Sequence, residues 1–104
     1  MIVVTTETIQ GRDISETLGL VRGNTIRARH VGRDIIAQLK TLVGGEIHEY
    51  AKLMGEAREQ AIDRMVSEAK SLGADAVVNV RFSTSVIIGG AAEMLAYGTA
   101  VRLS

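Results

Sequence analysis

Apolar side chains recur at helical spacing through the middle of the chain. One stripe runs from about Ile47 to Leu72, with charged residues on the opposite side; it comprises Met54, Ala57, Ala61, Met65, Ala69 and Leu72. A shorter stripe of the same period predicts another helix over Asp34–Val43. At about 1.5 Å per residue the longer helix spans roughly 40 Å. Because a domain of this size needs a shorter helix, we expect part of this long helix to pack on something other than the subunit's own core.

Alternation of apolar and polar residues predicts strands on both sides of the helices. Ile2–Thr5 is a short β-branched strand. Thr17–Ala28 is extended around a turn-like Gly23-Asn24, and is either one strand broken by a bulge or turn, which we favour, or a hairpin. Two further strands are predicted after the long helix, over Ala76–Phe82 and Glu93–Leu103.

The junction after the long helix is the clearest local signal. Gly73 is expected to end the helix, because glycine adopts the left-handed conformation of a helix stop without a Cβ clash. The alternation that follows places three apolar residues on one face of a strand: Val78, Val80 and Phe82. The strand Glu93–Leu103 is apolar on both faces, which is typical of a strand covered on both sides. Two helices can cover one face of a small sheet, so we expect a second copy of the chain to cover the other.

The element order ββααββ predicts an α+β fold in a single domain over residues 1–104. We expect a two-layer sandwich of a small, mainly antiparallel sheet with two helices. Apolar residues make up 46% of the chain and aromatic residues only 3%, so the core must consist mainly of aliphatic and alanine side chains. Stacked aromatic platforms for nucleic acid or sugar are therefore not expected.

Charge and hydropathy exclude several partners. Lys plus Arg and Asp plus Glu each number 12, so the chain offers no basic excess for nucleic acid or an acidic membrane. The first residues carry no basic leader, and no apolar run approaches the roughly 20 residues of a membrane span. We expect a soluble cytoplasmic protein with neither nucleic acid nor membrane as a partner.

Candidate chemistry is sparse. The chain has no cysteine, which excludes disulfides, thiolate metal sites and cysteine nucleophiles. His30, at a strand–helix junction, is interpreted as making a local hydrogen bond, with a ligand or general-base role as the alternative. Glu46, His48 and Glu49 are weak candidate ligands for a divalent metal ion, the one cofactor we consider. Acidic residues near the start of a helix are expected in any case, because they favour the positive end of its dipole.

The remaining polar motifs have structural interpretations. Gly89-Gly90 is expected in a hairpin loop, since phosphate-binding loops lead from a strand into a helix. The neighbouring Ser83, Thr84 and Ser85 are assigned to the same loop, without the Gly-x-Ser-x-Gly pattern of a serine hydrolase. Asp75 is expected to accept a local hydrogen bond in its turn. Arg81 is expected to pair with an acidic residue across a subunit interface, with anion binding as the alternative.

Motifs spread over nearly the whole chain resemble the YbjQ-like family of uncharacterised bacterial proteins, a family labelled "putative heavy-metal-binding". They are Thr5-Thr6, Arg33-Asp34, Val43-Gly44-Gly45, Tyr50, Ala57-Arg58-Glu59, Glu68-Ala69, Leu72-Gly73-Ala74-Asp75-Ala76-Val77-Val78 and Gly98-Thr99-Ala100-Val101. Dodecins have similar helix-to-strand junctions. The resemblance implies a small β/α subunit that assembles into a ring, expected to be a pentamer. The absence of cysteine departs from the metal-binding label, and no catalytic residues carry over.

The leading hypothesis is therefore a cytoplasmic homo-oligomeric ring that serves as a binding or scaffold module for an unknown ligand. Metal binding at repeated sites around the ring, through Glu46, His48 or Glu49, is the alternative. A small enzyme with sites shared between subunits and His30 or His48 as base comes last, because the sequence offers no nucleophile–base pair.

Overall fold

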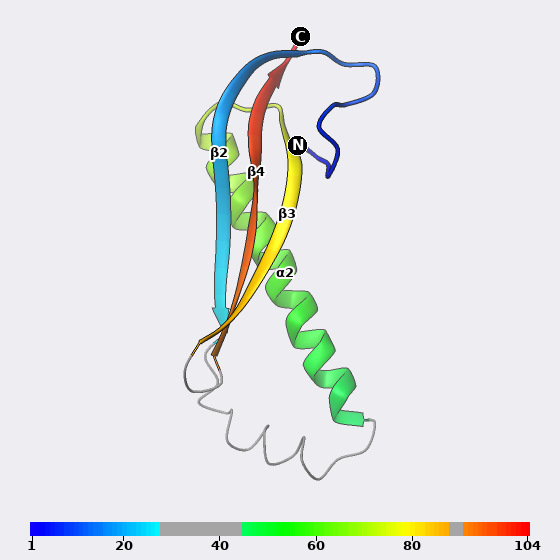
Figure 1. Cartoon of the computed structure of the whole chain (residues 1–104), viewed down its shortest axis with the longest axis vertical. Coiled ribbons are helices and arrows are strands. Elements are labelled where there is room, and N and C mark those ends of the chain that lie inside the picture. Colours follow the sequence, from blue (N-terminus) through cyan, green and yellow to red (C-terminus); the bar gives the residue numbers. More distant parts are fainter. Residues whose placement is uncertain (28–44, 88–90) are drawn as a thin grey trace.

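The computed structural model describes residues 1–27, 45–87 and 91–104. Along the chain these form β1 (Ile2–Val3), β2 (Ile14–Arg27), α2 (Gly45–Ser71), β3 (Ala76–Ile87) and β4 (Ala91–Leu103), as Figure 1 shows. The helix predicted over Asp34–Val43 and the pair Gly89-Gly90 lie outside the described residues. The described part of the chain thus places one helix against the sheet, where the sequence predicted two.

The four strands form one mixed sheet in the order β1-β3-β4-β2. β1 runs parallel to β3, whereas β4 is antiparallel to both of its neighbours, β3 and β2. α2 lies behind the sheet in Figure 1 and packs mainly over β2 and β4. The two-layer α+β architecture with a mainly antiparallel sheet is confirmed.

β2 is one long strand, and the turn considered at Gly23-Asn24 is absent. Its bulges lie nearer its start, between Ile14 and Glu16 and between Thr17 and Gly19. A Cβ atom on Gly23 would lie 2.3 Å from the carbonyl oxygen of Ala61. The glycine is therefore explained by the close approach of α2, not by a turn.

β3 is longer than predicted and changes face partway. Ser83, Thr84 and Ser85 pair with β4 instead of forming a loop, because the antiparallel pairing continues through this exposed half of the strand. A register shift follows Val78, and Asn79 has a positive φ of 55°. This bulge moves Val80 to the face that packs under α2, while Val78 joins the cluster on the other face. The prediction that Val78 and Val80 share a face is therefore wrong.

The predicted helix stop is confirmed. Gly73 has φ of 78°, its N–H donates to the carbonyl of Lys70 at 3.0 Å, and the N–H of Ala74 donates to that of Ala69 at 3.1 Å. These two bonds form a Schellman motif, and they satisfy carbonyls that the helix end would leave unpaired. β3 then begins at Ala76.

The main core lies between α2 and the sheet and consists largely of small side chains. Four residues of the predicted stripe are 0–1% exposed: Ala57, Ala61, Met65 and Ala69. They pack against Val21, Val77 and Val80 and against the alternate β4 residues Met94, Ala96 and Ala100. Leu72, the last predicted member of the stripe, is 42% exposed because it lies beyond the helix end.

Candidate functional site

The sheet face turned away from α2, here called the open face, is covered at one end by the chain's own first residues. Val4, Ile9 and Ile14 pack against a second apolar cluster formed by Ala76, Val78 and Val101. This N-terminal segment is held by backbone bonds: the N–H of Val4 donates to the carbonyl of Val77 at 3.0 Å, and that of Val80 to the carbonyl of Val4 at 3.1 Å. The other end of the open face is not covered by any described residue of the chain.

Strand register places polar residues in rows across the uncovered end. Tyr97 of β4 lies between Arg22 of β2 and Arg81 of β3. One step along the strands, Leu95 lies between Asn24 and Ser83. Directly paired residues point to the same side of a sheet, so each row forms one neighbourhood on the open face.

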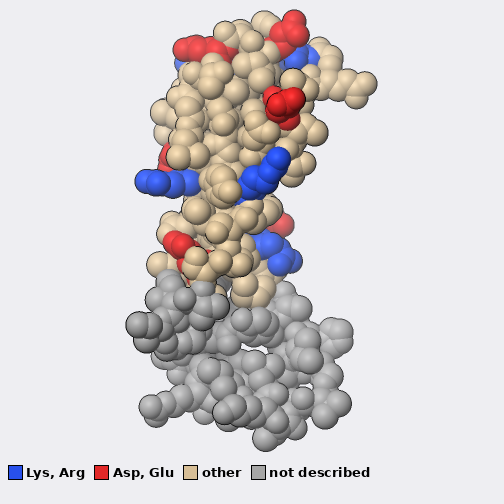
Figure 2. Space-filling model, viewed as in Figure 1, with Lys and Arg blue, Asp and Glu red and all other residues tan. Residues whose placement is uncertain are grey.

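The charges on this face are scattered. In the view of Figure 2 most of the described surface is uncharged, and the basic and acidic side chains form small groups separated by uncharged surface. A surface of this kind has no extended basic or acidic field, so any charged ligand must be held by individual side chains.

A cavity of about 350 Å³ lies on the open face between β2 and β4. Its lining residues are Arg22, Asn24, Glu93 and Leu95. The side-chain amide of Asn24 donates to Oε2 of Glu93 at 3.2 Å. Arg22 has no hydrogen-bond or ion-pair partner among the described residues, although the carboxylate of Glu93 lines the same cavity.

Sequence reasoning missed this cavity because Asn24 and Glu93 are 69 positions apart. The available signal was the polar pair Arg22 and Asn24 alternating with buried residues of β2. That pattern indicates a solvent-facing side, but the opposing Glu93 could be identified only from the register.

Arg81 occupies the same row as Arg22 but is already engaged. Its Nη1 donates to the carbonyl of Thr5 at 2.8 Å and to that of Val80 at 2.9 Å. The guanidinium therefore joins β3 to the N-terminal segment. Its predicted pairing with an acidic residue of another subunit stays a prediction.

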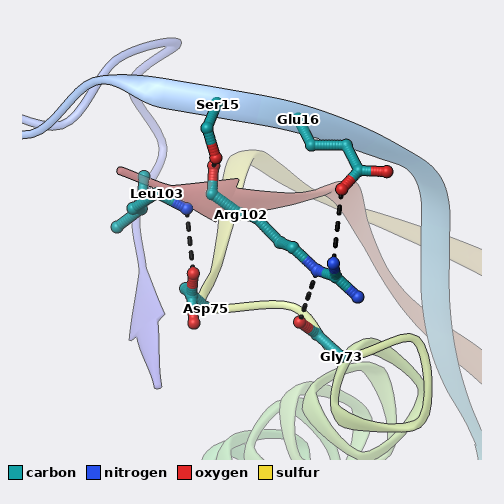
Figure 3. A network of polar contacts seen from close by, with 6 residues as sticks. All are labelled: Ser15, Glu16, Gly73, Asp75, Arg102 and Leu103. Atoms are coloured by element: carbon teal, nitrogen blue, oxygen red, sulfur yellow. Dashed lines mark hydrogen bonds and ion pairs between the residues drawn. The ribbon is translucent and has the colours of Figure 1, made fainter.

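A second polar cluster surrounds the carboxyl end of α2 (Figure 3). Nε of Arg102 donates to the carbonyl of Gly73 at 3.2 Å, and Nη1 lies 3.4 Å from Oε1 of Glu16. Oδ2 of Asp75 accepts a hydrogen bond from the backbone N–H of Leu103 at 2.9 Å. The expectation of a local turn bond for Asp75 is wrong, since its partner lies on the neighbouring strand β4. These contacts join the helix end and the turn after it to β4, and β4 to β2, which is a structural role.

The candidate metal ligands remain separate from both clusters. Glu46, His48 and Glu49 lie in the first turns of α2, where the side chains are not described, and His30 lies outside the described residues. In the described ranges, no group of three or more His, Asp or Glu side chains is placed to hold a metal ion. A hollow of about 630 Å³ lies along α2, and the described residues that line it all belong to that helix, between Gly55 and Asp63. Among the described helical residues, none form a span long and apolar enough to cross a membrane.

Comparison with known proteins gives matches over the whole chain. A UPF0145 protein of Methanosarcina acetivorans is 59% identical over 103 residues, covering 99% of this chain and 97% of the relative. One from Archaeoglobus fulgidus is 62% identical over 103 residues, covering 99% and 95%. Archaeal relatives therefore match, so the description of the family as bacterial was too narrow.

A crystal structure from Pediococcus pentosaceus, a protein of unknown function in the DUF74 family, matches with a TM-score of 0.68. The alignment covers 100% of this chain and 98% of that one at 14% identity, so the likeness shows the fold alone. The model of the YbjQ family, described as "Putative heavy-metal-binding", matches residues 1–104. The chain belongs to this YbjQ family.

Proposed function

We propose that this protein is the subunit of a cytoplasmic homo-oligomer, a pentameric ring, that serves as a binding or scaffold module. The observation that carries the proposal is a pair of sheet edges without a strand partner among the described residues, each bordered by exposed apolar side chains. The copy number is the one that the resemblance to the YbjQ-like family implies.

The first edge is the outer side of β2. This 14-residue strand ends the sheet order, so only its β4 side has a strand partner in the described sheet. Nη1 of Arg64 donates to the carbonyl of Asn24 at 2.6 Å, which occupies one position of the edge. The part around Leu20 has no such cover among the described residues, and Leu20 is 63% exposed.

The second edge belongs to the far half of β3. β1 pairs only with Ala76 and Val77, and backbone bonds from the N-terminal segment extend no further than Val80. From Arg81 to Ile87 the described sheet has no strand on this side. Phe82, in this half of the strand, is 44% exposed.

Two different free edges favour a head-to-tail assembly. Monomeric proteins usually shorten, charge or cover long strand edges, because such edges pair readily with other chains. Pairing the β2 edge of one copy with the β3 edge of the next is a heterologous contact, and such contacts close into a ring when the rotation permits. The elongated subunit agrees with this, since its Cα radius of gyration is 17.0 Å, against about 13 Å expected for a compact chain of this length.

Sedimentation velocity of untagged protein at micromolar concentration tests the proposal. We expect a single oligomeric species, and native mass spectrometry to give five copies. Leu20→Lys places a charge beside the β2 edge and should shift the protein toward monomer. Ser67→Lys, at an exposed position of α2, is the matched control and should leave the assembly unchanged. A monomeric wild-type protein would refute the proposal.

Metal binding through Glu46, His48 or Glu49 stays a separate prediction. Symmetry in a ring would repeat one weak cluster several times. Elemental analysis of the untagged protein beside a His48→Ala variant tests it, and equal metal content in the two would remove His48 from the candidates.

A further inference from the structure

We propose that the cavity between β2 and β4 binds a small zwitterion, a molecule with one oxyanion group and one ammonium group. The oxyanion would contact Arg22, and the ammonium group would contact Glu93. This inference names the ligand class of the binding module proposed above. The cavity is formed within one chain, however, so it does not depend on assembly.

The charges lining the cavity carry the argument. Arg22 and Glu93 lie two rows of the register apart, with the row of Asn24 and Leu95 between them. Here Arg22 has no partner among the described residues, and the described contact of Glu93 is the hydrogen bond from Asn24 at 3.2 Å. A neutral amide thus holds the carboxylate, and the positive and negative groups are left facing one space. A ligand with the reverse arrangement of charges would satisfy both groups.

The shape of the cavity agrees with a small ligand. Its volume of about 350 Å³ lies at the lower end of the range for small-molecule sites. Leu95 supplies an apolar lining residue between the charged ends, suited to a short hydrocarbon spacer. Tyr97 is the direct cross-strand neighbour of Arg22, and its hydroxyl, which has no partner among the described residues, can donate to the same oxyanion.

The row of Arg22, Tyr97 and Arg81 contains two arginines, and only Arg22 is assigned to the ligand. Arg81 lies on the other side of Tyr97, but two backbone carbonyls already accept hydrogen bonds from its guanidinium. Arg22, which has no partner among the described residues, offers five N–H donors in a planar fork that matches the geometry of carboxylate and phosphate groups.

Binding is tested on the full-length protein by following backbone amide resonances during titration. The probes are phosphoethanolamine, which carries a phosphate and an ammonium group, and β-alanine, which replaces the phosphate by a carboxylate. Inorganic phosphate and ethanolamine each supply one charge alone. We expect at least one zwitterion to bind saturably and about tenfold more tightly than either single-charge probe, as one additional charged hydrogen bond implies. The largest shifts should fall on β2 and β4.

Four variants separate this site from general electrostatic attraction. Arg22→Gln should abolish saturable binding, while Arg22→Lys, which keeps the charge, should retain part of it. Glu93→Gln should remove the preference for the zwitterion over inorganic phosphate. Arg58→Gln removes the same charge from an exposed position on α2 and should change nothing.

Three outcomes would overturn the proposal: no saturable shift with either zwitterion, no preference for a zwitterion over its anion, or equal losses in Arg22→Gln and Arg58→Gln. Sedimentation of the same samples reports assembly separately. An intact oligomer without binding refutes only the ligand, and binding by a monomer refutes only the ring.

Discussion

The two faces of the sheet are formed by the same strands but differ in how deeply their side chains are buried. Under α2, the alternate β4 residues Ala96 and Ala100 are 0% exposed. On the open face, Tyr97 and Thr99 of the same strand are only partly buried. Both faces of β4 are largely apolar in sequence, so the hydrophobicity of this strand alone does not decide which face the chain covers.

Side-chain size explains the difference. The covered face presents glycine and alanine where the helix crosses, and a Cβ atom on Gly23 would lie 2.3 Å from the backbone nitrogen of Met65. The helix backbone therefore rests almost directly on the strand. The uncovered end of the open face carries long side chains instead, including Arg22 and Tyr97, which would hold a helix at a greater distance. We infer that this end is shaped for a contact other than the chain's own helix.

The largest predicted effect comes from removing the close approach on the covered face. Gly23→Ala places a methyl group against the backbone of Ala61 and Met65, which a flexible side chain cannot relieve. We expect the free energy of unfolding to fall by about 3 kcal/mol or more. Urea denaturation followed by circular dichroism measures the change.

Gly55→Ala is the matched control for this prediction. Gly55 lies within α2, and the nearest atom to an added methyl group would be Nη2 of Arg58 at 3.7 Å. Alanine has the higher helix propensity, so this variant should gain up to about 1 kcal/mol. If both glycine variants changed stability in the same direction, close packing would not be the reason for Gly23.

The same glycine shows how far the sequence could predict the fold. The helical stripe and the stop at Gly73 depend on local spacing, and both can be recognised from it. Gly23-Asn24 has the local composition of a turn, and only the position of α2 shows that the glycine serves packing. The bulge at Asn79 likewise depends on pairing with the N-terminal segment, since the N–H of Asn79 donates to the carbonyl of Thr6 at 2.9 Å.

The candidate cavity was less predictable than the fold. Its polar members on β2 and β4 become neighbours through strand register, and a shift of one residue would move every side chain to the other face. Alternation alone could place Arg22 and Asn24 on an exposed side. It could not join them to Glu93.

The second prediction compares the two ends of the open face. Val78, covered by the N-terminal segment, is 3% exposed, whereas Leu20 is 63% exposed. Val78→Ala should lower the free energy of unfolding by about 2 kcal/mol, because two buried methyl groups are lost. Leu20→Ala should cost less than about 0.5 kcal/mol in dilute protein, as for other surface changes.

Protein concentration sharpens this second comparison. Thermal unfolding of the two variants should be recorded at low and at high concentration. If Leu20 borders a subunit contact, the effect of Leu20→Ala should grow with concentration, while the effect of Val78→Ala should stay constant. A concentration-independent result for Leu20 would count against the β2 edge as an assembly contact.

The third prediction concerns a buried hydroxyl group on the covered face. Thr25 is 3% exposed, and its Oγ1 has no hydrogen-bond partner among the residues that the structure describes. Thr25→Val keeps the shape of the side chain and removes the buried hydroxyl, so we expect a gain of about 1 kcal/mol. Chemical denaturation measures the gain, and Thr25→Ser, which keeps the hydroxyl and loses a methyl group, should be destabilising. A loss of stability in Thr25→Val would show that the hydroxyl is hydrogen-bonded in solution.

The smallest predicted effect lies where the sheet meets the end of α2. Arg102 and Glu16 are 3.4 Å apart, but their side chains are 49% and 55% exposed, so water screens most of the attraction. Glu16→Gln should therefore change stability by less than about 0.5 kcal/mol. Arg102→Gln should cost more, because it also removes the donor to the carbonyl of Gly73, where a positive charge favours the helix end. Denaturation at low and high salt distinguishes these contributions, since only the charge-dependent part should weaken with ionic strength. Equal costs for the two variants would mean that the ion pair to Glu16, and not the bond to Gly73, accounts for the contribution of Arg102.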